Sequence, residues 1–150
     1  MDLNNQIAVI TGGASGMGKM CAQFLGQRGV RVVVWDKDVK GLKDSEIACD
    51  VSSAEDVEQA LEITIANVGI PRICINCAGI APAQRMVGKE GAMPLAAFKQ
   101  VIDINLVGTF NVSRLVAHKM SQALPYRDEE RGVIIHTASI AAFGATGPLG

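Results

Sequence analysis

The stretch IAVITGGASGMG (residues 7–18) joins a short apolar run to a glycine-rich turn. The apolar run, residues 7–11, predicts a buried strand, and the residues after the turn predict a helix. The evidence for that helix is a set of apolar residues at helical spacing, and Gly29 is expected to cap its end. These residues are Met17, Met20, Cys21, Phe24 and Leu25. A strand, a glycine turn and a helix in this order are typical of a loop that binds phosphate groups.

Three glycines of the turn have separate expected roles. Gly12 permits a tight turn with positive φ, and Gly16 lets backbone N–H groups approach a pyrophosphate. Gly18 lets the helix pack close to the sheet. The spacing is TG-x3-G-x-G rather than G-x-G-x-x-G. A turn with a purely structural role therefore remains the alternative.

The next strand, RVVVWD (residues 31–36), is a continuous apolar run that we expect to be buried on both faces. It ends at Asp36, whose carboxylate can accept hydrogen bonds from both hydroxyls of an adenine ribose. The same carboxylate would repel a 2′-phosphate, which favours NAD over NADP. Lys37 could reduce the repulsion of a 2′-phosphate by Asp36, or it could simply be a solvated lysine. The alternative for Asp36 is a plain turn residue.

Strands and helices alternate along the rest of the chain. We expect strands at 46–51, 72–76 and 132–139, a helix after the capping-box sequence SSAED (52–56), a loop over 81–93 and a long helix from Pro94 to about Ala123. This alternation predicts right-handed crossovers and an α/β fold with a doubly wound parallel sheet of the Rossmann type. Residues 1–150 form a single domain in this interpretation. Ligands of such sheets bind beyond the carboxyl ends of the strands.

The composition excludes several classes of function. With 14 basic and 15 acidic residues, the chain has no charge excess with which to bind nucleic acid. The polar start MDLNNQ predicts no signal peptide, and no apolar stretch approaches the ~20 residues that span a bilayer. We therefore expect a cytoplasmic protein without membrane contact.

The four cysteines do not indicate a metal site. Cys74 and Cys77 have the C-x-x-C spacing of redox and zinc motifs, but a closed zinc site needs two more ligands at a similar spacing. The remaining cysteines and the histidines are isolated: Cys21, Cys49, His118 and His136. Buried thiols in a reducing compartment are the favoured interpretation.

Several motifs occur together in a characteristic order: TGGASGMG (11–18), a strand ending at Asp36, CDV (49–51), NCAGI (76–80), DINLVGTFNV (103–112) and GVIIHTAS (132–139). In this order and spacing they resemble the short-chain dehydrogenase/reductase family over essentially the whole chain. Residues 88–117 and 131–143 look in particular like type II 3-hydroxyacyl-CoA dehydrogenases. The resemblance implies an NAD-dependent oxidoreductase that interconverts 3-hydroxyacyl-CoA and 3-oxoacyl-CoA.

The resemblance also implies roles for individual residues. Ser15 and Met17 would contact the cofactor, and Asp36 would hold the adenosine ribose. The adenine would lie beside Asp50 and Val51. The segment Asn76, Cys77, Ala78 and Gly79 would line the cofactor and brace the sheet. The full set of expected cofactor-binding residues is Gly12, Ser15, Gly16, Met17, Gly18, Asp36, Asp50, Val51, Asn76, Cys77, Ala78 and Gly79.

Two further residues look catalytic by the same resemblance. Asn105 would hold a water in a proton relay, and Ser139 would donate a hydrogen bond to the carbonyl oxygen as negative charge builds there. Without the family, Asn105 could instead bond a neighbouring carbonyl, and Ser139 could simply end a strand. His136 stands where the subgroup usually has Asn. A packed or hydrogen-bonded His136 is favoured over an acid–base role.

The family's general acid is a Tyr in Tyr-x-x-x-Lys, and this motif is absent from the 150 residues. The single Tyr, Tyr126, precedes the last strand in a polar loop and is no candidate. The expected Tyr falls just beyond Gly150, so we expect the amino-terminal part of a longer enzyme, with the final strands missing after Gly150. The alternatives are another secondary-alcohol or hydroxysteroid dehydrogenase, and a non-catalytic dinucleotide-binding module.

The predicted long helix is apolar on more than one face, which indicates burial on both sides. Members of the family commonly pair through this helix. We therefore expect a homotetramer that binds a small-molecule substrate, either an acyl-CoA or a secondary alcohol.

Overall fold

The computed structural model describes residues 2–39, 45–82, 84–89, 91–126 and 129–139. Five parallel strands form its central sheet in the order β3-β2-β1-β4-β7. They are β1 (Ile7–Thr11), β2 (Arg31–Asp36), β3 (Glu46–Ala48), β4 (Ile73–Asn76) and β7 (Val133–His136). The expectation that the final strands are missing after Gly150 falls outside the described residues.

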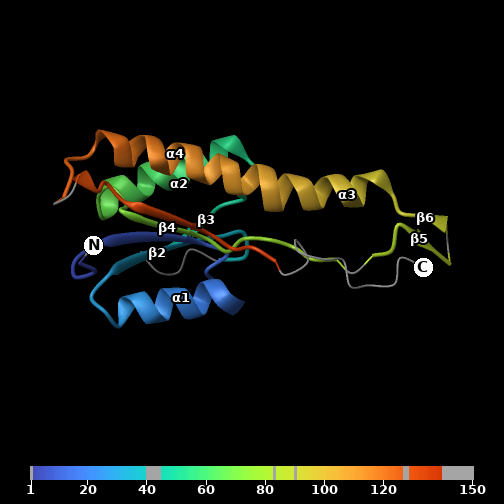
Figure 1. The fold of residues 1–150 in the computed structure, drawn as a ribbon, viewed down its shortest axis with the longest axis horizontal. Helices are drawn as coiled ribbons and strands as arrows, with labels where there is room; N and C mark the ends of the chain where they lie inside the picture. The colour runs from blue at the N-terminus through green and yellow to red at the C-terminus, as the bar shows by residue number, and fades with distance from the viewer. Residues whose placement is uncertain (1, 40–44, 83, 90, 127–128, 140–150) are drawn as a thin grey trace.

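Helices cover both faces of this sheet. In Figure 1, α1 (Gly16–Gly26) lies on one face, and α2 (Ala54–Asn67) and α4 (Thr109–Gln122) lie on the other. The chain passes through α1 between β1 and β2, through α2 between β3 and β4, and through α4 between β4 and β7, which is the doubly wound arrangement that the alternation predicts. The predicted Rossmann-type α/β fold is therefore confirmed.

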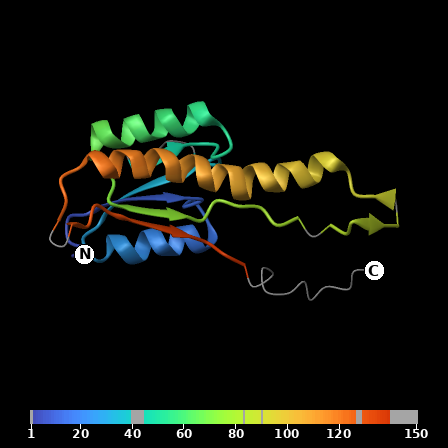
Figure 2. The same ribbon diagram turned by 45° about the horizontal axis from the view of Figure 1, so that its top comes forward.

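The long helix is continuous but not uniform. It begins as α3 (Leu95–Ile102), passes through the π-helical segment η1 (Asp103–Gly108) and continues as α4. Its α3 end extends beyond the sheet toward a short antiparallel hairpin, β5 (Val87–Gly88) and β6 (Gly91–Ala92) (Figure 2). The boundaries agree with the expected helix from Pro94 to Ala123, but the hairpin lies where the sequence predicted only a loop.

The core has two parts, one on each side of β1. The larger part packs Val9, Trp35 and Cys74 against apolar residues of α2 and α4. The smaller part packs Ile10 and Ile75 against the α1 side. All residues of β1 are buried because the strand has a neighbour on each side and helices on both faces.

Two local expectations need correction, and a third is confirmed. The third strand ends at Ala48 rather than residue 51, because the chain turns there and the Ser52 N–H donates to Asp50 Oδ1 at 3.0 Å. The helix α1 ends at Gly26, and Gly29 closes it as predicted: Gly29 has φ +80°, its N–H donates to the Gly26 carbonyl, and the Val30 N–H donates to the Leu25 carbonyl. Strand β2 is not fully buried on both faces. Its Val33 and Trp35 are buried, whereas the residues that point toward α1 are half-buried.

Candidate dinucleotide-binding site

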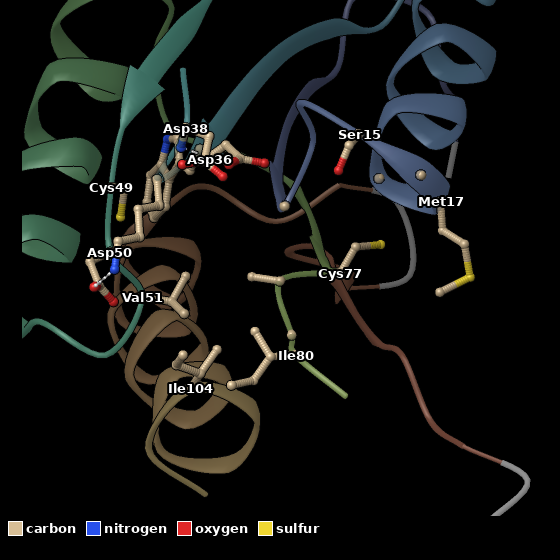
Figure 3. A pocket seen from close by; sticks show the side chains of 17 residues that line it. Ser15, Met17, Asp36, Asp38, Cys49, Asp50, Val51, Cys77, Ile80 and Ile104 are labelled. Carbon is tan, nitrogen blue, oxygen red and sulfur yellow. Dashed lines mark hydrogen bonds and ion pairs between the residues drawn. The ribbon is translucent and has the colours of Figure 1, made fainter. Parts of the chain in front are cut away.

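A cavity of about 290 Å³ lies at the carboxyl ends of β1, β2 and β4, where the loop after β3 and the segment η1 also reach it (Figure 3). All the predicted cofactor-binding residues except Asn76 line this cavity. The cavity also has lining residues that were not among the predicted cofactor-binding residues: Trp35, Lys37, Asp38, Cys49, Ile80 and Ile104. Five of these, all except Asp38, are direct neighbours of predicted site residues, so adjacency in the sequence was the available signal.

The glycine turn approaches the next strand too closely for any side chain. A Cβ on Gly12 would lie 2.8 Å from the backbone N of Ala78, and Gly12 has φ +66°. A Cβ on Gly18 would lie 2.3 Å from the carbonyl oxygen of Gly12. Both positions therefore require glycine, and the backbone of the turn is held between α1 and the end of β4.

The amino terminus of α1 opens into the cavity. The helix begins at Gly16, which has φ +49° and open space where a side chain would stand. Ser15 is the N-cap residue but makes no side-chain capping bond to the helix. The first N–H groups of a helix lack partners within it and carry the positive end of its dipole. These features fit an anion such as the pyrophosphate of a dinucleotide.

Asp36 connects the end of β2 to the glycine turn. Its Oδ2 accepts a hydrogen bond from the Ala14 N–H, and its Oδ1 accepts one from the Asp38 N–H, each at 3.0 Å. A carboxylate oxygen can accept more than one hydrogen bond. The Asp36 carboxylate is therefore fixed at the rim of the cavity and retains acceptor capacity for hydroxyl groups.

Asp50 is held as an anion at the rim beyond the end of β3, next to Lys37. Its Oδ1 accepts from the Ser52 hydroxyl at 2.6 Å and from the Ser52 N–H, and its Oδ2 lies 3.3 Å from Lys37 Nζ. The hydrogen bond from the Ser52 hydroxyl, followed by the Ser52 N–H and the Lys37 ammonium, lowers the pKa of Asp50 although its partial burial opposes this.

The loop after β3 is braced by a residue that the sequence analysis did not assign. Asn111, a buried residue of α4, donates through Nδ2 to the carbonyls of Val51 and Ser53 at 3.0 and 3.1 Å. Ser53 caps α2 by accepting from the Asp56 N–H, as the capping-box sequence predicts. The available signal for Asn111 was a polar side chain within the apolar face of the long helix.

The turn after β4 is held by hydrogen bonds with Thr11 and with Asn105. The Thr11 hydroxyl accepts from the N–H groups of Cys77 and Ala78, each at 3.2 Å. Asn105 Oδ1 accepts from the Ile80 N–H, and Asn105 Nδ2 donates to the Ile80 carbonyl, each at 2.8 Å. The Asn105 side chain thus makes the structural bond that was its alternative role. It fixes the wall of the cavity next to Ile104.

Asn76 and His136 lie side by side in the sheet, behind the cavity wall. Asn76 Nδ2 is 3.3 Å from His136 Nδ1 and donates to Ser113 Oγ at 3.4 Å. Asn76 therefore braces β4 against β7 and α4 and does not line the cavity. His136 is hydrogen-bonded, in agreement with the favoured interpretation.

Ser139 follows β7 and is exposed. It does not belong to the residues that line the cavity. The preceding Thr137 fixes this segment to β4, since its N–H and its hydroxyl both donate to the Asn76 carbonyl at 3.1 and 2.8 Å. The catalytic roles of Ser139 and Asn105 remain predictions.

The two cysteines of the C-x-x-C spacing lie in different parts of the core, and Cys77 lies beside Cys21. Cys74 packs in the core part beside α2 and α4, whereas Cys77 packs on the α1 side. Burial raises the pKa of Cys74 and of Cys49 to about 12 in each case. Within the described ranges, no group of three or more His, Cys, Asp or Glu side chains is arranged to hold a metal ion. No helix there is long and apolar enough to cross a bilayer.

Comparisons with known proteins agree with this geometry. The chain is 43% identical over 148 residues to human 3-hydroxyacyl-CoA dehydrogenase type-2, an alignment that covers 91% of this chain and 57% of the human protein. It is 36% identical to a mitochondrial borneol dehydrogenase of Lavandula x intermedia, with 97% and 56% covered. The crystal structure of 3-hydroxyacyl-CoA dehydrogenase type-2 from Mycobacterium avium superposes with a TM-score of 0.81 at 32% identity, covering 93% of this chain and 59% of that one.

The chain thus spans less than two thirds of the length of these relatives. The sequence model of the short chain dehydrogenase family matches residues 6–147, nearly the entire chain. Together with the parallel sheet and the glycine turn, this match shows that the chain belongs to the short-chain dehydrogenase family.

Proposed function

We propose that the cavity binds NAD and that the chain is the amino-terminal, cofactor-binding part of a dehydrogenase that interconverts 3-hydroxyacyl-CoA and 3-oxoacyl-CoA. One observation carries the proposal: the amino terminus of α1, the bare Gly16 backbone and the fixed Asp36 carboxylate border one cavity. The names of the human and mycobacterial relatives support the choice of substrate.

The residues present fit the cofactor. The N–H groups at the start of α1 would hold the pyrophosphate, and Asp36 would accept hydrogen bonds from the adenosine ribose. The adenine would lie between Val51 and the rim that carries Asp50. NAD, when bound, supplies or accepts the hydride. This chain would fix the orientation of the cofactor through the turn after β4, which Thr11 and Asn105 hold in place.

In the proposed reaction, Ser139 donates a hydrogen bond to the carbonyl oxygen of the substrate, and Asn105 takes part in proton transfer through a held water. A Tyr-x-x-x-Lys motif supplied by a continuation of the chain would provide the general acid. This chain covers less than two thirds of the length of its relatives, which supports the proposal that the Tyr-x-x-x-Lys motif lies in a further part of the protein. We place the enzyme in the cytoplasm, as a homotetramer.

A second candidate is the oxidation of another secondary alcohol. The similarity to a borneol dehydrogenase favours it, because the name of that relative gives borneol, a secondary alcohol, as its substrate. A dinucleotide-binding module without catalysis is the candidate from a different class.

The experiment is an assay of the protein from its complete reading frame with NADH and acetoacetyl-CoA. We expect NADH oxidation that exceeds turnover with camphor or an oxosteroid. Ser139→Ala should lower kcat by about 10²–10³-fold, the scale for a donor to a developing oxyanion. Ser121→Ala, a hydroxyl at the far end of α4, is the matched control. Preference for camphor would favour the second candidate, and turnover with none of these substrates would favour the binding module.

A further inference from the structure

The rim of the cavity carries an ion pair between two neighbouring strand ends. Lys37 directly follows β2 and Asp50 follows β3, and Lys37 Nζ lies 3.3 Å from Asp50 Oδ2 (Figure 3). Both residues line the cavity, together with Asp36 and Asp38. Lys37 is the only basic residue among the described residues that line it.

Asp50 is the fixed partner of this pair. Its Oδ1 is occupied by both donors of Ser52, and its backbone N–H donates to Asp56 Oδ2 at 3.0 Å. Asp56 is itself bonded to the N-cap residue of α2. The Lys37 side chain is 71% exposed and flexible, so the position of its ammonium is set by the ion pair with Asp50. An ion pair this exposed contributes little to stability.

The Asp36 oxygens accept from the N–H groups of Ala14 and Asp38, and among the described residues Lys37 forms its ion pair with Asp50 rather than with Asp36. Lys37 therefore has two possible partners at this end of the cavity. One is Asp50, and the other is a phosphate on the ribose beside Asp36. A 2′-phosphate carries more charge than a carboxylate and would attract the ammonium strongly if the ammonium were released.

We propose that Asp50 is a specificity-determining residue, which excludes 2′-phosphorylated nucleotides by engaging Lys37 across the rim. This inference rests on the proposed NAD site. Under it, Asp36 repels the phosphate while Asp50 withholds the one nearby cation that would offset that repulsion. The chain thus carries a lysine next to Asp36 without gaining an NADP site.

The test uses two ligands that fill only the adenosine end, 5′-AMP and adenosine 2′,5′-bisphosphate, which differ by the 2′-phosphate alone. Their dissociation constants are measured by calorimetry for the wild type, Asp50→Asn, Lys37→Met and the double variant. Asn at position 50 keeps a side chain of nearly the same shape that still accepts from Ser52. Asp38→Asn, a carboxylate of the same rim, is the matched control for loss of charge.

We expect Asp50→Asn to shift the affinity ratio toward the bisphosphate by about 5- to 10-fold, less than a buried charge-assisted hydrogen bond contributes, because the Lys37 side chain is largely exposed. Lys37→Met alone should leave the ratio unchanged, and in the double variant the gain should disappear. Asp38→Asn should produce a smaller shift that persists when Lys37 is also replaced by Met.

Two results would overturn the inference while the proposed site stands. One is a gain in Asp50→Asn that persists without the lysine, which would show a general effect of charge. The other is loss of bisphosphate binding in Lys37→Met alone, which would show that the lysine already serves the phosphate. Failure of the folded wild type to bind 5′-AMP would instead refute the proposed function, and the inference with it.

Discussion

At the scale of single residues, Asp36 links two parts of the site through one carboxylate. It accepts from the Ala14 N–H in the glycine turn and from the Asp38 N–H beyond β2. Removing the carboxylate would leave both N–H groups without this acceptor and would loosen the turn against β2. Asp36 thus matters both for the proposed contact with ribose and for the shape of the cavity.

Replacing Asp36 tests that double role. We predict that Asp36→Ala weakens NADH binding by about 1–3 kcal/mol, the scale for hydrogen bonds to a charged group. The ratio of the NADPH dissociation constant to the NADH dissociation constant should decrease, because Asp36 no longer repels the 2′-phosphate. The single tryptophan, Trp35, lines the cavity, so titration of its fluorescence with each cofactor gives both dissociation constants. An unchanged ratio between the two constants would contradict the assignment of Asp36.

Two buried thiols predict how stability depends on pH. Burial raises the pKa of Cys49 and Cys74 to about 12 from an ordinary value of 9.0. Below pH 9 these thiols are protonated in both the folded and the unfolded state, so their stabilising effect is complete. Between pH 9 and 12 only the unfolded chain ionises them, so the free energy of unfolding should fall as the pH rises.

The measurement is urea unfolding at a series of pH values through this range. A Cys49→Ala/Cys74→Ala variant is the comparison, because other groups also titrate there. The double variant should lose less stability than the wild type over the same interval. Equal losses in both proteins would show that these thiols do not cause the dependence.

At the scale of elements, the long helix joins the cavity to the exposed surface. On its inner side, Asn105 fixes Ile80 by two hydrogen bonds, and Asn111 fixes the loop at Val51. Asn105 lies within the π-helical segment η1, where the Thr109 hydroxyl donates to its carbonyl at 2.7 Å. One helix therefore positions two walls of the cavity.

Asn105 should affect binding through the turn that it holds. We predict that Asn105→Ala lowers the stability by about 1 kcal/mol, the net value of lost hydrogen bonds to an exposed segment. It should also weaken NADH binding, because Ile80 and the turn before it lose their anchor. Urea unfolding and fluorescence titration measure the two effects, with Gln100→Ala on the exposed side of α3 as control. Unchanged binding would show that the turn keeps its shape without Asn105.

The outer side of the long helix remains apolar. Val112 and Val116 are buried, whereas Phe98, Leu106 and Phe110 are 53%, 64% and 66% exposed. We predict that the protein from the complete reading frame covers this face by self-association into a tetramer. Light scattering should show the tetramer, and Phe110→Glu should dissociate it, because a buried charge without a partner is costly. A stable monomer at micromolar concentration would contradict the prediction.

The elements also show what the sequence could and could not predict. Continuous apolar runs and helical spacing located the strands and helices, because both patterns report burial. The early end of β3 depends on the Asx turn at Asp50 and Ser52, and no apolar pattern in the sequence distinguishes the π-helical segment from the α-helix on either side of it. The segment with Asn76 was expected both to line the cofactor and to brace the sheet. The hydrogen bonds of Asn76 to Ser113 and His136 show the bracing role, and Asn76 is not among the residues that line the cavity.

At the scale of the whole molecule, the two ends of the sheet have different characters. The carboxyl ends of the strands carry the cavity with its carboxylates. At the amino-terminal ends, the Tyr126 hydroxyl donates to Gln6 Oε1 at 2.6 Å, and Arg72 stacks on the Tyr126 ring. Tyr126 therefore lies at the end of the sheet opposite the proposed cofactor, which agrees with its exclusion as the general acid.

The sheet also presents an uncovered side at β7. Val133 and Ile135 are 38% and 47% exposed, and β7 is the last strand of the described sheet. Apolar side chains beside an open strand edge promote association with other chains. A continuation of the chain that adds strands and helices, as in the proposed longer enzyme, would cover this side.

The last prediction follows from this division between binding and catalysis. Residues 1–150 expressed alone should bind NADH but show no turnover of acetoacetyl-CoA, and they should aggregate more readily than the protein from the complete reading frame. In the proposed mechanism, Ser139 and Asn105 orient the carbonyl and its water, but Tyr126 is remote from the cavity and His136 is bonded to Asn76. The loss of a positioned general acid costs about 10²–10⁴-fold in rate. NADH oxidation by the two proteins, assayed side by side, measures the difference. Comparable rates would refute the Tyr-based mechanism, and the effect of His136→Asn on the shorter chain would then identify or exclude His136 as the acid.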